Sequence, residues 1–173
     1  RQDLTDNVAG ATTRHTVWAL GKAESWGAQA EAEGIASDAL RRLAVEMDNI
    51  LAVYRSAMPA APETALRALL ALDPLMHQSG ATRLQFDRLN EVLTRIDDIP
   101  EPLRTRGRIS RSLAALWCGK AKAARTELES VLSSGESSPE LICRALLCLS
   151  QAAFQMDQPT WSAQYAREAL EVA

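Results

Sequence analysis

The chain has 173 residues, enough for one domain with a sizeable buried core. Hydrophobic residues make up 47% of it but aromatic residues only 5%, and most of the difference is alanine and leucine, which favour helices. Its 19 basic and 22 acidic residues give a net charge of -3, so a general electrostatic affinity for nucleic acid is excluded.

The first predicted helix pair covers residues 12–58. Residues 1–11 have no hydrophobic period and are predicted to be a loose or disordered lead-in. A threonine can cap the first helix, and residues 27–34 are compatible with either its continuation or a loop. Ser37 can cap the second helix. The apolar residues of that helix recur mostly every three or four positions, which predicts one buried stripe: Leu40, Leu43, Met47, Ile50, Leu51 and Tyr54.

The second predicted pair covers residues 62–97. Its first helix begins near Pro62, since proline is tolerated in a first turn. Pro74 lies inside the apolar pattern of that helix, so we expect a kink or an early end there. Thr82 opens the second helix of this pair, and the proline-rich segment that begins at Ile99 ends it.

The remaining two pairs, residues 103–133 and 139–173, have the same layout. Gly80, Gly119 and Asp157 each end the first helix of a pair, at spacings of 39 and 38 positions. Helix–turn–helix units at a fixed period are typical of helical repeat arrays. Small residues at the start of the second helices would let paired helices approach closely: Ala121, Ala124, Ala163 and Ala166.

These patterns together predict an all-α fold. We expect a right-handed superhelix of about four antiparallel helix pairs, a tetratricopeptide-like α-solenoid, in which residues 12–173 form a single domain. The chain begins at Arg1 and stops directly after a helical pattern, which we interpret as a fragment of a longer protein.

No recognised catalytic or phosphate-binding motif occurs in the sequence, so we predict that the chain is not an enzyme and has no cofactor. His15 and His77 lie in different helices and are expected to make capping or half-buried polar contacts. Cys143 and Cys148 project about 140° apart around one helix, which is unfavourable for zinc. We therefore predict no metal site, and cysteines that pack as small core residues.

The three cysteines, with Cys118 as the third, are an odd number without short regular spacing. This pattern argues against a disulfide framework and favours a reducing compartment. Neither a signal peptide nor a membrane-spanning stretch is visible in the sequence. The prediction is a cytoplasmic protein.

Arg104, Arg108 and Arg111 form the sharpest candidate for a binding surface. At about 100° per residue they fall within about 60° of one another, as a basic ridge along one helix. One interpretation is a solvated face paired with acids on the next helix, such as Glu127 or Glu129. The other is a docking ridge for an acidic partner segment or a phosphate.

Three other residues are interpreted as structural. Asn49, three positions after Glu46, is expected to bond the backbone of a neighbouring helix or loop, because asparagine in mid-helix has poor propensity. Trp117 and Trp161 flank turns and are expected to fill gaps between stacked pairs rather than to line a peptide pocket.

Several segments resemble the bacterial signal-transduction (STAND-type) ATPases. One such segment lies near the start of the chain and contains Arg14, His15, Trp18 and residues 43–52. It looks like the segment that leads from the nucleotide-binding and winged-helix part of those proteins into a C-terminal tetratricopeptide-like array. Residues 112–128 and 144–170 are similar to repeats of that array. Members include LuxR-type and SARP-type transcriptional activators and serine/threonine kinases with fused ATPase modules. The resemblance implies a regulatory segment that receives a signal and controls the ATPase.

The predicted function is therefore non-catalytic protein–protein interaction. The expected partner is another protein or the upstream ATPase or kinase domains of the same polypeptide, with no direct contact to nucleic acid or membrane. The alternative is a small-molecule sensor whose superhelix encloses an apolar pocket lined by Trp117, Met76 and Tyr165. Exposed repeat ends are compatible with self-association in either case.

Overall fold

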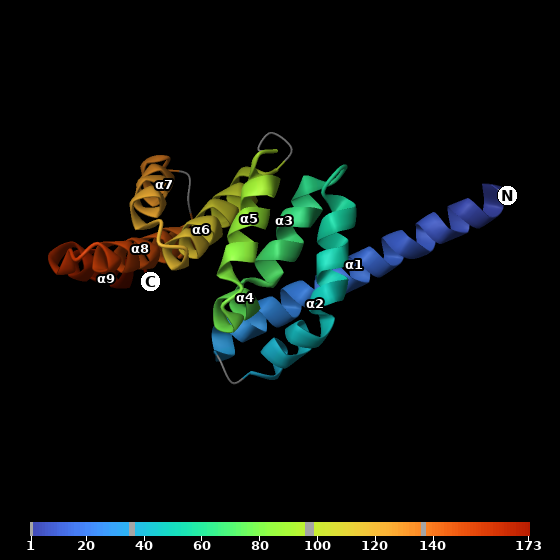
Figure 1. Cartoon of the computed structure of the whole chain (residues 1–173), viewed down its shortest axis with the longest axis horizontal. Coiled ribbons are helices and arrows are strands. Elements are labelled where there is room, and N and C mark those ends of the chain that lie inside the picture. The colour runs from blue at the N-terminus through green and yellow to red at the C-terminus, as the bar shows by residue number, and fades with distance from the viewer. Residues whose placement is uncertain (1, 35–36, 96–98, 136–137) are drawn as a thin grey trace. The chain divides into compact units, whose positions relative to one another are not determined.

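The computed structural model describes residues 2–34, 37–95, 99–135 and 138–173, with side chains from Arg14 onward except that of His15. The described residues are all-α, as predicted, and contain no β-strand (Figure 1). Their helices are α1 (Gln2–Glu33), α2 (Asp38–Ala57), α3 (Pro62–Ala71), α4 (Asp73–Ser79), α5 (Thr82–Leu93), α6 (Glu101–Trp117), α7 (Ala121–Ser133), α8 (Pro139–Gln155) and α9 (Pro159–Val172). The chain divides into two compact units, residues 1–78 and 79–173.

Helix α1 begins earlier than predicted, and of the two alternatives left open for residues 27–34, continuation of the helix is observed as far as Glu33. It begins at Gln2, so residues 2–11 are helical rather than a loose lead-in, and it continues past Gly27 to Glu33. No proline interrupts this stretch, and a glycine inside a helix weakens it without ending it. The helix ends only where Gly34 adopts a φ of 79°, a left-handed conformation that glycine takes at little cost.

Helices α1, α2 and α3 pack against one another in the first unit. The hydroxyl of Ser37 accepts a hydrogen bond of 3.3 Å from the backbone N–H of Leu40, which confirms the predicted cap of α2. The predicted stripe of α2 is buried except at Met47, which is half-buried. The core of this unit includes Leu43, Ile50, Leu66, Leu69 and Leu72.

At Gly27 the backbone of α1 comes close to α3. A Cβ atom placed on Gly27 would lie 2.8 Å from the backbone oxygen of Ala71 and 3.2 Å from its Cα. Arg67 of α3 also holds α1, because its guanidinium donates to both carboxylate oxygens of Glu24 at 2.6 and 2.8 Å. These bonds raise the pKa of Arg67, with burial opposing the effect.

The predicted break near Pro74 is confirmed. α3 ends at Ala71, α4 begins at Asp73, and Pro74 occupies the first turn of α4. Proline has no N–H to bond the carbonyl four residues earlier, so one continuous helix would lose a hydrogen bond and clash at this position.

The second unit contains a structural repeat of 38 residues. α6 and α8 each have 17 residues and begin 38 positions apart. α7 has 13 residues and α9 has 14, and these two helices also begin 38 positions apart. The turns that follow α6 and α8 are closed by the same bond, from the N–H of Lys120 to Ala115 O and from the N–H of Gln158 to Ala153 O, at 2.9 Å each. Such a six-to-one bond is typical of the Schellman motif.

The equivalent turn residues, Gly119 and Asp157, have φ values of 73° and 57°. Asp157 is the only described non-glycine residue with a positive φ, and its Cβ makes that conformation unfavourable. We expect Asp157→Gly to raise the free energy of unfolding by about 0.5–1 kcal/mol, since the strain disappears. Urea unfolding followed by circular dichroism would measure this. Asp157→Ala provides the control, because it keeps the Cβ and should not stabilise.

Candidate functional site

The three arginines of the predicted ridge line one hollow in the second unit. Arg104, Arg108 and Arg111 project from α6, Glu127 projects from α7, and the other lining residues are Glu101 and Leu93. The hollow has a volume of about 400 Å³. We call this set of residues the basic hollow.

Ion pairs connect the arginines of the basic hollow to its two carboxylates. Arg108 Nε and Arg111 Nη2 both approach the same oxygen, Oε1 of Glu127, at 2.6 and 2.8 Å. Arg108 also donates from Nη2 to Ser130 Oγ at 3.1 Å. Arg104 pairs with Glu101, one turn earlier on α6. The predicted pairing with the next helix is therefore confirmed for Glu127.

Glu129, the other acid considered for that pairing, bonds Arg125 of its own helix at 2.7 Å. This bond raises the pKa of Arg125, as does the charge of the same carboxylate, while desolvation acts in the opposite direction. Arg125 also donates to Oε1 of Gln158 at 2.8 Å and lies 5.8 Å from the centroid of the Trp161 ring. It thus ties α7 to the turn between α8 and α9.

The basic hollow keeps positive charge and donor capacity beyond its internal pairs. Arg108 and Arg111 share one carboxylate, that of Glu127, so these three side chains carry one net positive charge. The two arginines have about ten N–H donors, whereas one carboxylate offers about four acceptor sites. The Arg108, Arg111 and Glu127 side chains are about one-quarter exposed, at 25%, 25% and 26%. An incoming carboxylate or phosphate can reach these donors without unfolding the helix pair.

A second hollow of about 200 Å³ shares Arg111 and Glu127 with the basic hollow. Its other side is formed by Phe86 of α5 and by Lys120 at the start of α7. The ammonium of Lys120 lies over the Phe86 ring at 4.1 Å from its centroid, a favourable cation–π position. The positive charge around α6 therefore continues to the turn before α7.

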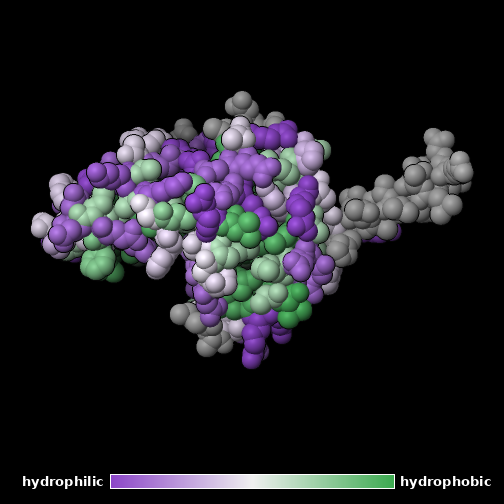
Figure 2. Space-filling view, in the orientation of Figure 1, coloured by the Kyte–Doolittle hydropathy of each residue, from purple (hydrophilic) through white to green (hydrophobic). Residues whose placement is uncertain are grey.

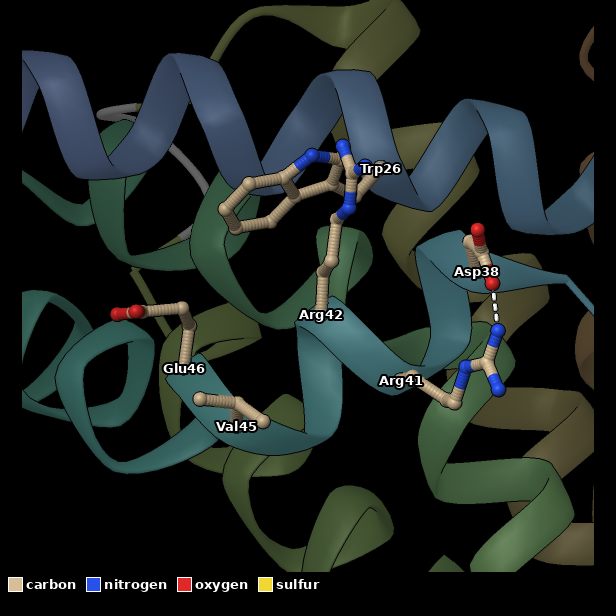
Figure 3. A pocket seen from close by; sticks show the side chains of 6 residues that line it. All are labelled: Trp26, Asp38, Arg41, Arg42, Val45 and Glu46. Carbon is tan, nitrogen blue, oxygen red and sulfur yellow. Dashed lines mark hydrogen bonds and ion pairs between the residues drawn. The ribbon is translucent and has the colours of Figure 1, made fainter.

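The first unit has a different hollow, of about 270 Å³, between α1 and α2. Figure 3 shows Trp26 on α1 and the side chain of Arg42 extending from α2 toward it, with Arg41 paired to Asp38. Val45 and Glu46 complete the lining. Sequence reasoning did not single out this hollow, because the four charged residues that α2 contributes are two acids and two bases and form no patch of one sign.

Asn49 does not have the role predicted for it. Its side-chain amide donates to Oε2 of Glu46 in its own helix at 2.7 Å, and Asn49 is exposed. The prediction of a bond to a neighbouring backbone is wrong, because the residue lies on the solvent side of α2, where a side chain three positions away is the nearest acceptor.

The predicted core roles of the two tryptophans are also not observed. Trp117 is 59% exposed and Trp161 is 45% exposed, so neither fills a gap between helix pairs. The neighbouring interior positions are already filled by small residues such as Ala115 and Ala152. Trp161 instead lies against Tyr165, with ring centroids 6.0 Å apart.

None of these three hollows is lined by Trp117, Met76 or Tyr165, the residues expected around an apolar sensor pocket. Trp117 is mostly exposed, and Met76 is a core residue with 1% exposure. Tyr165 packs against the core cluster around Leu128. The small residues predicted at the start of the second helices are buried only in part: Ala124 is buried, Ala121 and Ala166 are half-buried, and Ala163 is exposed.

Within the described ranges, no three His, Cys, Asp or Glu side chains gather as a metal site would require. Cys148 is buried, Cys118 and Cys143 are half-buried, and all three are free thiols. His77 is half-buried, and the side chain of His15 lies outside the described part. None of the described helices combines the length and apolar character needed to cross a bilayer.

Comparison of the chain with protein families, with curated proteins and with solved structures gave no match.

Proposed function

We propose that the chain is a non-catalytic helical-repeat module that binds an acidic segment of a protein partner through the basic hollow. The observation that supports this most directly is the convergence of Arg108 and Arg111 on one oxygen of Glu127. Each guanidinium is a rigid planar group, and the N–H donors that these bonds do not use suit carboxylates. Further carboxylates would neutralise the excess positive charge of this surface.

The wider setting of the proposal is a regulatory protein. The resemblance of the sequence to the tetratricopeptide-like array of bacterial signal-transduction ATPases supports this setting, although the 38-residue repeat is longer than the tetratricopeptide unit of about 34 residues. In that setting the array is a right-handed superhelix, and the acidic segment belongs to a partner or to the ATPase or kinase part of the same polypeptide. Binding would favour one arrangement of the regulator over another through its differential affinity for the two.

Neutral substitutions test the role of the arginines best. Charge reversal would place new carboxylates beside Glu127, so lost binding could then be due to local repulsion. We expect Arg108→Gln with Arg111→Gln to weaken binding of a fluorescent Asp/Glu-rich peptide by about tenfold or more, measured by fluorescence anisotropy at low salt. Arg41→Gln with Arg83→Gln is the matched control, since these exposed arginines pair locally on α2 and α5.

Glu127→Gln provides an opposite test of the same surface. It removes the internal carboxylate that competes with the peptide, so affinity should rise severalfold, and added salt should reduce the gain. An Asn/Gln peptide of matched length should bind neither the wild type nor the Glu127→Gln variant. Equal affinities for the wild type and both variants would contradict the proposal. A thermal shift with small organic anions, without peptide binding, would favour the sensor function instead.

A further inference from the structure

The second hollow adjoins the basic hollow along α6. It shares Arg111 and Glu127 with the basic hollow, and its lining also includes Lys120, Asn90 and Phe86. α6 packs against both α5 and α7, so residues of α5 and the residue that precedes α7 reach the same hollow. All of these residues belong to the second unit.

The backbone of Lys120 is held in place at both of its polar groups. Its N–H donates to the carbonyl of Ala115 at 2.9 Å, and its carbonyl accepts from the N–H of Ala124 at 3.0 Å. The ammonium of the side chain lies 4.1 Å from the centroid of the Phe86 ring, and that ring packs against the core cluster of Ala115 and Ala124. The ring therefore holds the positive charge of Lys120 at the hollow.

This charge has no acidic partner among the described residues. Lys120 forms no ion pair with a described carboxylate, and the first turn of α7 contains no acidic residue. Glu127, the one acid in the lining, is already shared by Arg108 and Arg111. The side chain of Asn90 likewise makes no hydrogen bond to another described residue. The second hollow thus offers an ammonium and an amide N–H₂ to an incoming acceptor.

A carboxylate fits this hollow better than an apolar side chain does. An apolar group would displace water from the ammonium and the amide without replacing the hydrogen bonds of that water, which costs free energy. A carboxylate would replace them, and its short aliphatic stem would contact Ala123 and Ala124 of the lining. On the face shown in Figure 2, hydrophilic side chains predominate over α6 and α7, left of the centre of the view.

We propose that the acidic segment of the partner binds with two acidic side chains at once, one in the basic hollow and the other beside Lys120 and Asn90 in the second hollow. This inference rests on the proposed function. Because the hollows share Arg111 and Glu127, their occupants are neighbours, and one short segment can supply both. Two weak contacts joined in one segment bind more tightly than either alone, since the second forms at a high effective concentration.

The three lysines of the chain make the second contact directly testable. They are Lys22, Lys120 and Lys122, and all three are exposed. A carbodiimide takes up water as it joins a carboxylate to a neighbouring lysine amine in an amide bond, and it does not couple arginine. We expect the Asp/Glu-rich peptide to couple to Lys120 in preference to the other two lysines, as mapped by mass spectrometry after digestion. Lys122 is the internal control, because it is two residues away on α7 and lines neither hollow.

Lys120→Gln measures how much the second contact contributes. It should weaken binding of the same peptide by about two- to fivefold at low salt, the range expected for a partly exposed ion pair. Fluorescence anisotropy would measure the change. Lys122→Gln removes the same charge from the same part of the chain and should leave the affinity nearly unchanged. Both side chains are exposed, so circular dichroism should not differ between the two variants.

Two Gly/Ser-rich peptides test whether one segment fills both hollows. One has a single Glu, and the other has two Glu separated by a short flexible spacer. The second Glu should raise the affinity for the wild type severalfold, and Lys120→Gln should remove that gain. Titration followed by NMR suits both peptides, because it detects weak binding.

Equal coupling at the three lysines, or a gain from the second Glu that persists in Lys120→Gln, would overturn this inference. If Arg108→Gln with Arg111→Gln still weakened peptide binding in that case, the basic hollow would remain the binding site and the proposed function would stand. If these two arginine substitutions also had no effect, the proposed function itself would fail.

Discussion

Gly27→Ala is expected to lower the free energy of unfolding by about 1–3 kcal/mol, although alanine is the better helix former. The added Cβ would lie 2.8 Å from the backbone oxygen of Ala71, and a backbone atom cannot turn aside as a flexible side chain can. Relief requires α1 to move away from α3, which loosens the packing of both helices.

Gly21→Ala is the matched control on the same helix. A Cβ at Gly21 would have no neighbour within 4 Å, so only the helix propensity changes. We expect this variant to gain about 0.5–1 kcal/mol. Urea unfolding followed by circular dichroism would compare the two, and hydrogen exchange of the amides of α1 and α3 would assign the loss to the first unit. Equal gains in both variants would show that α1 and α3 are not in close contact at Gly27.

Leu116→Ala should cost about 2–5 kcal/mol, whereas Phe154→Ala at the equivalent repeat position should change stability by no more than about 0.5 kcal/mol. Leu116 is 2% exposed and packs against Ala124 and Ala152, so truncation leaves a cavity between helices. Phe154 is 74% exposed and leaves none. Chemical unfolding of the two variants measures the difference directly.

This comparison also tests the repeat. If the two substitutions had similar costs, the two helix pairs would be covered alike, and Phe154 would be buried in solution. If Phe154→Ala were stabilising, the phenyl ring would be strained where it lies. Either result would change the description of the second repeat without affecting the basic hollow.

Much of the helical layout could be predicted because its signals are local. Ser37 caps α2, and Pro74 ends α3, through interactions within one turn of the residue itself. The spacing of Gly119 and Asp157 indicated a repeat, and their φ values show why these positions end helices. The full length of α1 could not be predicted, since helical periodicity is weak in its first third.

The candidate site was predicted in part. The arginine ridge follows from helical geometry alone, and one of the two expected acidic partners, Glu127, pairs with it. The predicted core position of Trp117 and the predicted backbone bond of Asn49 were wrong. Both depend on whether a neighbouring element covers the residue, and the periodicity of the sequence does not show that. A tryptophan next to a turn has the same sequence context whether a neighbouring helix covers it or not.

The position of α8 also affects how the chain folds as it is made. α6 and α7 leave the ribosome before α8, so Ile109 lacks the α8 part of its core cluster until α8 has been synthesised. At about 5–20 residues per second this interval lasts on the order of a second, far longer than the roughly microsecond time of helix formation. A ribosome-bound chain that ends after α7 should therefore present an open apolar surface to chaperones.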